Sequence, residues 1–324
     1  MYFTLKSSDQ LCFSIIVTGR CNLNCSYCHY YKRHQRDKVS FDISEELFDK
    51  YLDFILLVKE RHHQNIQVRF SGGEPLLLES RLFNLANRVY RTLGVKPYIL
   101  TNGGKLNQNI IDKSIDSNIS AYLVSLENPF DIDDGGLDPS ILIRKIKTYN
   151  SEALPLKPGV VIVRNRMFSR LLEICDYFYG EIEEIPTVTE LNFSSFQPPA
   201  DFEISELNAN VHKIVNKYFS RVALDIFPYI TPELANCFQN RYLIEFGLTD
   251  SLKIQETKDD DERIRILYKY LDKAYPLSTC SETGCDWYAC CHRIKWVWKN
   301  NFRDYCRMKK AISDAYYDAL METQ

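Results

Sequence analysis

The chain has 324 residues and a formal net charge of −3 at pH 7, so it is long enough for a full hydrophobic core and an appended region. A weakly acidic chain has no global basic field, and we expect no non-specific binding to nucleic acid or to an anionic membrane. No apolar run approaches the ~18 residues of a membrane-spanning helix. The N-terminus lacks the pattern of a signal peptide, so we expect a cytoplasmic protein.

Short runs rich in β-branched and aromatic residues alternate with helical patterns along the first two thirds of the chain. The expected strands are 12–19, 67–71, 97–101, 121–126, 159–164 and 190–196. The expected helices are about 43–60, 79–94, 107–117, 138–150, 168–180 and 205–220. Asp42, with Glu45 three positions on, is predicted to cap the first helix. Six alternations predict right-handed βαβ units and therefore an α/β fold with a parallel sheet, either open or closed toward a barrel.

Beyond residue 220 this alternation is not evident. The acidic run from Lys258 to Arg263 predicts the start of a solvated helix, and a cysteine-rich tail follows it. We therefore expect a main domain at 10–220 and a separate C-terminal region at 221–324.

The cysteines are clustered along the chain. Cys21, Cys25 and Cys28 follow the first predicted strand, and five more lie in the last quarter: Cys280, Cys285, Cys290, Cys291 and Cys306. Cytosolic thiols stay reduced, so metal binding is a better interpretation than a disulfide framework. Three soft thiolates on one loop suit zinc or an iron–sulfur cluster, and a missing fourth protein ligand leaves one coordination position open.

Other unusual residues follow the neighbouring predicted strands. Ser71-Gly72-Gly73-Glu74-Pro75 follows the second strand, Thr101-Asn102-Gly103-Gly104 follows the third, and Ser125 ends the fourth. Ligands gather where the carboxyl ends of parallel strands meet. The sequence therefore predicts one site at this edge, shared with the cysteine triplet.

Two of these motifs carry a family resemblance. Cys21-x3-Cys25-x2-Cys28, with Tyr27 before the last cysteine, resembles the signature of the radical S-adenosylmethionine (radical SAM) enzymes, and the 71–75 stretch resembles their second motif. The resemblance covers roughly residues 10 to 200 and implies a partial (β/α)6 barrel. It also implies that the three cysteines ligate a 4Fe-4S cluster whose open iron is chelated by SAM. Reductive cleavage of SAM would then give a 5′-deoxyadenosyl radical that abstracts hydrogen from a substrate.

The same resemblance implies which residues bind SAM: Tyr27, Gly72, Gly73, Glu74, Asn102 and Ser125. The glycines would let the backbone approach SAM closely, and the glutamate would accept a hydrogen bond from its ammonium group. The tyrosine would face the adenine, the serine the ribose, and the asparagine the same pocket. Plainer interpretations are a tight turn for the glycines and a loop donor for the serine.

The tail, "CSETGCDWYACCHRIKW" followed by "DYC", resembles the SPASM or twitch auxiliary-cluster regions, whose enzymes mostly modify peptides or proteins. The fold class is then a partial barrel followed by a small cysteine-rich domain. The side chains of the adjacent Cys290 and Cys291 should diverge, so the two seldom ligate the same cluster. We therefore expect one auxiliary 4Fe-4S cluster, with Cys280, Cys285, Cys291 and Cys306 as its ligands. Two clusters, with Cys237 and Cys290 as further ligands, a structural zinc site and ordinary buried thiols are the alternatives.

The resulting hypothesis is a radical SAM maturase that cross-links or epimerises a ribosomally made peptide. The alternatives are oxidation of a protein side chain, as in the sulfatase maturases, and a small-molecule reaction such as nucleotide dehydration with the tail as a structural metal site. A non-enzymatic metal-binding module is the remaining alternative. Many peptide maturases carry a precursor-recognition domain before the barrel, whereas the first predicted strand here begins near residue 11. We therefore expect recognition by a separate precursor-recognition protein or by the tail itself, along with an external electron donor. No catalytic acid or base is identified.

Overall fold

The computed structural model describes most of the predicted barrel and part of the C-terminal region. The described residues are 10–25, 28, 41–62, 65–132, 135–161, 169–183, 187–189, 201–218, 241–246 and 257–274, with 318 and 322. In this part of the chain no helix combines the length and the apolar character needed to cross a membrane.

Seven strands of the described chain form one sheet in which every neighbouring pair is parallel. They are β1 (Gln10–Thr18), β2 (Asn65–Gly72), β3 (Tyr98–Thr101), β4 (Ala121–Leu126), β5 (Leu156–Val161), β6 (Thr187–Thr189) and β7 (Arg241–Phe246). Their order across the sheet is β6-β5-β4-β3-β2-β1-β7. Because all strands run the same way, their carboxyl ends meet at one edge, which we call the rim.

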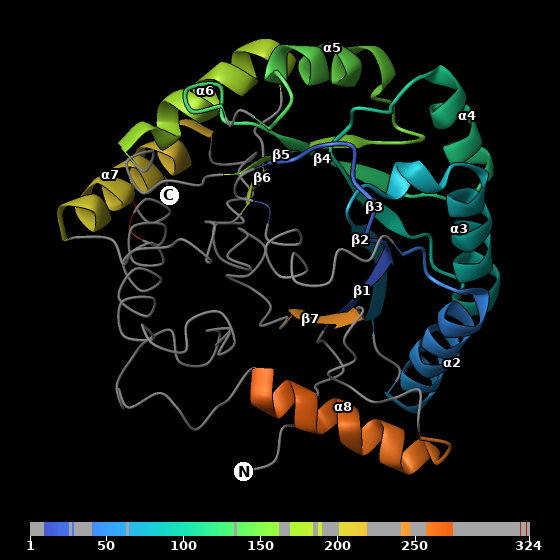
Figure 1. The fold of residues 1–324 in the computed structure, drawn as a ribbon. Helices are drawn as coiled ribbons and strands as arrows, with labels where there is room; N and C mark the ends of the chain where they lie inside the picture. The colour runs from blue at the N-terminus through green and yellow to red at the C-terminus, as the bar shows by residue number, and fades with distance from the viewer. Residues whose placement is uncertain are drawn as a thin grey trace.

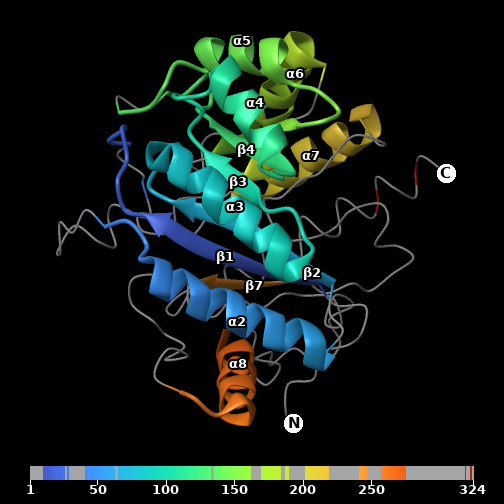
Figure 2. The ribbon, with the colours of Figure 1, turned by 90° about the vertical axis from the view of Figure 1, so that its right-hand side faces the viewer.

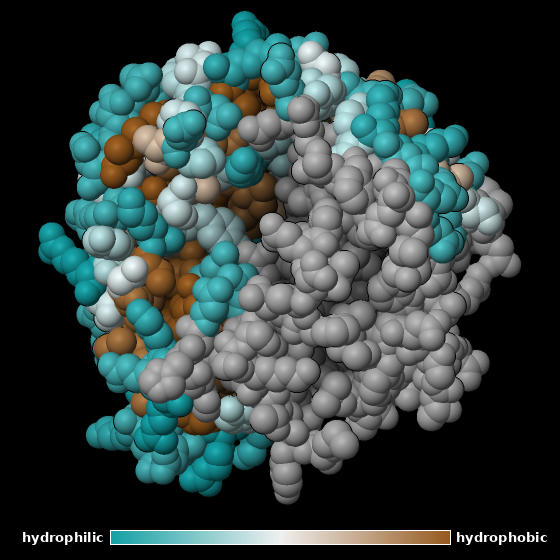
Figure 3. Space-filling view, turned by 180° about the vertical axis from the view of Figure 1, so that it is seen from behind, coloured by the Kyte–Doolittle hydropathy of each residue, from teal (hydrophilic) through white to brown (hydrophobic). Residues whose placement is uncertain are grey.

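The helices cover the outer face of the curved sheet (Figures 1 and 2). They are α2 (Glu45–His62), α3 (Ser80–Leu93), α4 (Gln108–Asp116), α5 (Pro139–Tyr149), α6 (Leu171–Ile182), α7 (Asp201–Tyr218) and α8 (Asp260–Ala274), with a short 3-10 turn, η2 (Pro75–Leu78), after β2. In the view from behind, hydrophilic side chains line the outer border of the described surface and apolar ones lie nearer its middle (Figure 3). The arrangement confirms the predicted α/β fold with parallel βαβ units.

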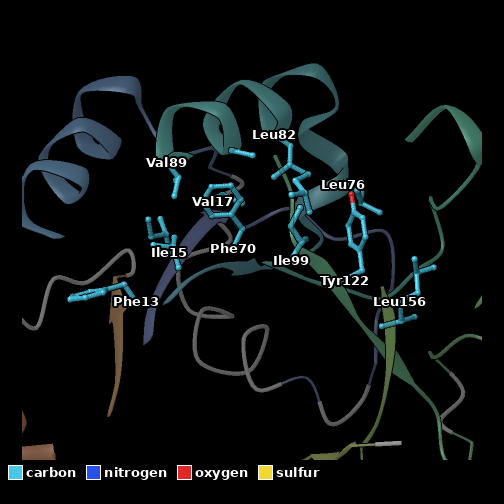
Figure 4. Close-up of a cluster of buried hydrophobic side chains, with 14 of the residues drawn as sticks. Phe13, Ile15, Val17, Phe70, Leu76, Leu82, Val89, Ile99, Tyr122 and Leu156 are labelled. Atoms are coloured by element: carbon cyan, nitrogen blue, oxygen red, sulfur yellow. The ribbon is translucent and has the colours of Figure 1, made fainter. Parts of the chain in front are cut away.

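The hydrophobic core lies between the sheet and the helices. Alternate residues of β1, such as Phe13, Ile15 and Val17, are fully buried, and Leu82 and Val89 of α3 reach the same core. Figure 4 shows Val17 close to Leu82 and Val89 between the strands and α3, whereas Phe13 lies farther from α3, beside β7. Full burial of one such side chain contributes about 1.5–3 kcal/mol, so the core holds the strand ends in fixed positions at the rim.

The sheet continues past residue 220, where we had expected the alternation to stop. β7 pairs with β1 from Gln10↔Arg241 to Ile15↔Phe246. Phe246 is buried and stacks on Phe13 at 5.7 Å and on Tyr51 of α2 at 4.4 Å between ring centroids. The strand pattern of β7 is short and is interrupted by charged residues, which hides it in the sequence. The acidic run does open a helix, since α8 begins at Asp260 as predicted.

Two local predictions differ from the structure, and a third lies outside the described residues. β5 begins at Leu156 rather than 159, because the sheet accepts Pro158 within the strand despite its missing amide donor. β6 is Thr187–Thr189, whereas the predicted strand 190–196 lies outside the described residues. The N-terminus of α2 is capped by Ser44, whose Oγ accepts a hydrogen bond from Leu47 N at 3.1 Å, and not by Asp42.

Candidate cofactor site

The cysteine loop, residues 19–28, leaves the carboxyl end of β1. Cys21 is exposed, and Cys25 and Cys28 are partly buried. The amide of Cys28 donates to the carbonyl of Cys25 at 3.1 Å. Protein atoms crowd around the Cys21 sulfur even though solvent reaches it, and this desolvation raises the pKa of its thiol; a hydrogen bond from Leu23 N opposes the effect. The structure thus brings all three predicted ligands onto one loop at the rim.

The segment after β2 is bonded to the start of this loop by its backbone. Gly73 N donates to Thr18 O at 2.9 Å, and Glu74 N donates to Arg20 O at 2.7 Å. A Cβ atom on Gly72, where φ is +129°, would lie 2.2 Å from Thr18 O, and one on Gly73 would lie 2.1 Å from Arg20 O. The space beside Gly72 is therefore filled by the end of β1, and the space beside Gly73 by the cysteine loop. The predicted contact of the two glycines with SAM stays a prediction. The backbone that they approach closely in the structure belongs to the protein itself, at Thr18 and Arg20.

Glu74 is fully buried and joins the β2 and β3 ends. Its Oε1 accepts from Leu76 N at 3.0 Å and from Thr101 Oγ1 at 2.7 Å, while Oε2 accepts from Asn102 N at 2.7 Å. Burial raises the pKa of Glu74, and these three hydrogen bonds oppose the shift. The described partners are all protein donors, whereas we had expected the ammonium group of SAM, so that contact stays a prediction.

Asn102 lies at the end of β3, next to the cysteine loop. Its Nδ2 donates to Asn22 Oδ1 at 2.9 Å and lies 3.8 Å from the Cys21 sulfur. Its Oδ1 accepts from Gly104 N at 2.9 Å. The predicted proximity of the third strand end to the triplet is therefore present in the structure.

Asp42 anchors the other side of the loop. Its carboxylate accepts from Arg20 Nε at 2.9 Å, Arg20 Nη2 at 2.8 Å and Thr18 Oγ1 at 2.7 Å. Burial disfavours the charge, but the bonds from Arg20 and Thr18 outweigh it and hold the pKa of Asp42 below its usual range. The residue predicted to cap α2 instead fixes the position of the residue directly before Cys21.

The structure describes only one of the remaining predicted site residues, Ser125. Ser125 is exposed near the end of β4, where its register partner is Gly159 of β5, and its contact with the ribose stays a prediction. The others lie outside the described residues: Tyr27, Cys237, Cys280, Cys285, Cys290, Cys291 and Cys306.

A second glycine pair, absent from the sequence prediction, lies near the cysteine loop, and its first member contacts the loop. Gly135 and Gly136 come between β4 and α5, and the Cys25 sulfur is 3.6 Å from Gly135 O. A Cβ atom on Gly135 would lie 2.1 Å from Asn24 O, and one on Gly136 would lie 2.4 Å from Glu127 Oε1. Paired glycines after a predicted strand were the available signal, the same one that drew attention to Gly72 and Gly73.

The donor set determines which group the loop could hold. Within the described residues, no three Cys, His, Asp or Glu side chains are grouped closely enough for a single metal ion. Three thiols on one partly exposed loop are the ligand type that iron–sulfur clusters use. The residues present therefore fit a cluster with one iron left open to another ligand.

Comparisons with known proteins agree with this site. Residues 15–165 match the model of the Radical SAM superfamily. The protein MJ0907 of Methanocaldococcus jannaschii is 26% identical over 152 residues, or 46% of this chain and 47% of that protein. The S-adenosylmethionine-dependent nucleotide dehydratase of Pseudoalteromonas ulvae is 28% identical over 142 residues, or 41% of this chain and 44% of the dehydratase. The chain thus spans about half the length of these relatives.

A solved structure extends the likeness in fold to nearly the whole chain. Native anSMEcpe with bound AdoMet and Cp18Cys peptide has a TM-score of 0.66 at 15% identity, covering 97% of this chain and 98% of that one. Fold, rim geometry and the match to residues 15–165 agree with the cysteine signature. Residues 15–165 of the chain thus match the radical SAM superfamily of enzymes, as the cysteine signature predicted.

Proposed function

We propose that the protein cleaves SAM reductively and abstracts a hydrogen atom from a peptide or protein substrate. The observation that carries the substrate class is the fold correspondence with anSMEcpe, a protein whose structure holds both AdoMet and a peptide and which matches 97% of this chain. The proposal includes cross-linking or epimerisation of a ribosomal peptide as the outcome, and a cytoplasmic location. A separate precursor-recognition protein and an external electron donor are further parts of it.

In this proposal, residues at the rim hold the cofactors. Cys21, Cys25 and Cys28 would hold the 4Fe-4S cluster, which when bound supplies the electron that cleaves SAM to methionine and a 5′-deoxyadenosyl radical. The bonds from Gly73 N and Glu74 N hold the loop against the β2 end. Gly73 and Gly135 let the chain approach the loop closely, and the proposed part of this packing is to orient the reacting groups.

The C-terminal region, residues 221–324, is proposed to provide an auxiliary cluster. Cys280, Cys285, Cys291 and Cys306 are its proposed ligands, and Cys237 with Cys290 would contribute to a second cluster if two are present. β7 belongs to this range but joins the barrel sheet. Iron and zinc counts separate the alternatives, because a structural zinc site binds zinc and each cubane cluster contains four irons.

Nucleotide chemistry is the second candidate, because the nucleotide dehydratase aligns over 142 residues at 28% identity. That alignment covers 41% of this chain, and the radical SAM match ends at residue 165. Similarity confined to less than half of the chain supports shared SAM chemistry more than a shared substrate.

The test uses the full chain, reconstituted with iron and sulfide and reduced without oxygen. We expect 5′-deoxyadenosine from SAM, and its loss in a Cys21→Ala, Cys25→Ala, Cys28→Ala variant. Peptides encoded beside the gene and nucleoside triphosphates are then offered as separate substrates, and products are identified by mass spectrometry. Absence of 5′-deoxyadenosine from a protein that contains its cluster would contradict the proposal. Turnover of a nucleotide but of no peptide would favour the second candidate.

The tail has its own test in a Cys280→Ala, Cys285→Ala, Cys306→Ala variant. We expect it to cleave SAM but to lose turnover of the peptide, with about four fewer irons per chain. Peptide turnover that survives these substitutions would contradict the auxiliary-cluster role.

A further inference from the structure

The cysteine sulfurs have unlike surroundings. The Cys21 sulfur is approached by two N–H donors, Leu23 N at 3.4 Å and Asn102 Nδ2 at 3.8 Å. The Cys25 sulfur instead lies 3.6 Å from a carbonyl oxygen, that of Gly135. A donor stabilises negative charge on sulfur, whereas a carbonyl oxygen does not.

The Asn102 amide is held in one orientation by its other contacts. Gly104 N donates to its Oδ1 at 2.9 Å, so the oxygen and nitrogen of the amide cannot be exchanged without losing this bond. Its own backbone N donates to Glu74 Oε2 at 2.7 Å. The Nδ2 group is therefore directed toward the cysteine loop, where Asn22 Oδ1 accepts one of its protons at 2.9 Å.

The support for this amide comes from outside the cysteine loop. Lys145 of α5 donates to Gly103 O at 3.1 Å and to Gly104 O at 2.6 Å. This lysine fixes the turn that follows Asn102, and the buried Glu74 fixes the residue itself. These contacts within the protein fix the position of the Asn102 donor.

We propose that Asn102 raises the reduction potential of the radical SAM cluster by donating an N–H···S hydrogen bond to its Cys21 ligand. Reduction adds negative charge to the cluster and its sulfurs, and a donor stabilises the reduced state more than the oxidised state. Asn102 acts through Cys21 and is a positioning residue; this differs from its expected place in the SAM pocket. The inference rests on the proposed function, since it requires that Cys21 ligate the cluster.

The test measures the midpoint potential of the SAM-responsive cluster. Asn102→Asp keeps the oxygen that accepts from Gly104 N and removes the donor to Cys21, but it also adds a charge. Asn22→Asp is the matched control, because it adds a charge at the same loop, keeps the acceptor for Asn102 and leaves the donor intact. Asn102→Ser removes the donor without a charge, and its hydroxyl can still accept from the turn.

Potentials are read by electron paramagnetic resonance during redox titration of the full-length holoenzyme. The relevant signal is the one that changes when SAM is added. We expect the potential of Asn102→Asp to lie below that of Asn22→Asp, and that of Asn102→Ser to lie below that of the wild type, with unchanged iron content. Equal potentials in both pairs would overturn the inference, and so would loss of the cluster from both Asn102 variants, which would indicate a purely structural role.

These outcomes are distinct from failure of the proposed function. A wild-type protein whose iron–sulfur signal does not respond to SAM would contradict the proposed function itself. A responsive signal with an unmoved potential contradicts the role of Asn102 alone.

Discussion

Two glycine pairs lie at the rim near the cysteine loop, one at the end of β2 and the other between β4 and α5, and they contact the loop differently. At the end of β2, Gly73 N and Glu74 N donate to Thr18 O and Arg20 O, where β1 leads into the loop. Before α5, the Cys25 sulfur lies 3.6 Å from Gly135 O, whereas Gly136 lies against Glu127. The first pair fixes where the loop begins, and Gly135 contacts its middle.

We expect the segment at the end of β2 to affect mainly the stability of the fold, and the 135–136 segment to affect mainly cofactor binding. The β2 segment is continuous with the central sheet, so disturbing it strains the strand ends as well as the loop. The 135–136 segment belongs to a connection at the rim, so disturbing it should move Cys25 with less effect on the core. Substitutions at the two sites should therefore separate stability from iron binding.

The largest effect is expected from Gly73→Ala. The added Cβ would lie 2.1 Å from Arg20 O and 2.6 Å from Arg20 C, both backbone atoms. The clash cannot be relieved without losing the bond from Glu74 N to Arg20 O, so we expect a loss of about 3 kcal/mol in the free energy of unfolding and poor retention of iron. Urea unfolding and iron per chain measure both.

Gly180→Ala is the matched control for this substitution. Gly180 lies inside α6 and a Cβ there would meet nothing within 4 Å. We expect stability to rise slightly, by up to about 1 kcal/mol, because alanine is the better helix former. Similar losses in both variants would mean that the contact with Arg20 is not the cause.

Gly135→Ala should lower the iron content more than it lowers the free energy of unfolding, the opposite of Gly73→Ala. Its Cβ would lie 2.1 Å from Asn24 O and 2.9 Å from Cys25 N, so the loop must shift at the ligand. We expect a loss of about 1–2 kcal/mol, smaller than for Gly73→Ala, together with a clear fall in iron per chain. Gly136→Ala is the control, since its Cβ meets the Glu127 side chain, which can rotate. Equal iron loss in Gly135→Ala and Gly136→Ala would contradict the explanation that the iron is lost because Cys25 is displaced.

Glu74→Gln tests the bond that joins β2 to β3 behind the loop. The glutamine amide keeps one oxygen as an acceptor, but its NH2 group would face at least one of the three donors, Leu76 N, Thr101 Oγ1 and Asn102 N. We expect a cost of about 1–3 kcal/mol. The pKa of Glu74 is raised in the folded protein, so folding favours its protonated form. The contribution of Glu74 to the free energy of unfolding is therefore fully present below the unfolded pKa and is lost as pH rises through the folded pKa. The difference in unfolding free energy between wild type and variant should therefore shrink as pH rises above about 4.5, and a growing difference would contradict the burial of this acid.

Local sequence patterns were sufficient for most of the fold. The strands of the barrel and their helices were predictable because each element carries its own apolar periodicity, as α3 does with Leu82 and Val89 on its buried face. β7 was not, because charges interrupt its short run. The cysteine triplet and Gly72–Gly73 were predictable as motifs within a few residues.

The contacts that complete the site were not predictable in the same way. Asn102 meets Cys21 across 81 positions of the chain, and Cys25 meets Gly135 across 110. Such pairs depend on which strand ends are neighbours at the rim, and no local pattern specifies them. The same limit explains why the sequence predicted a contact with SAM or a tight turn for the glycines at the end of β2, but not their close approach to Thr18 O and Arg20 O.

The smallest effect is expected at the exposed anchor, Asp42→Asn. The ion pair of Asp42 with Arg20 is partly exposed, so we expect a loss of about 0.5–1 kcal/mol near neutral pH. Because the folded pKa of Asp42 is lowered, its contribution is present above the unfolded pKa and is lost as pH falls through the folded value. The dependence is thus opposite in sign to that of Glu74, and urea unfolding below about pH 4 measures it. Glu46→Gln, which breaks an exposed pair with Lys50 on α2, is the control: it should leave iron content unchanged, whereas Asp42→Asn should lower it, because Asp42 holds the residue directly before Cys21.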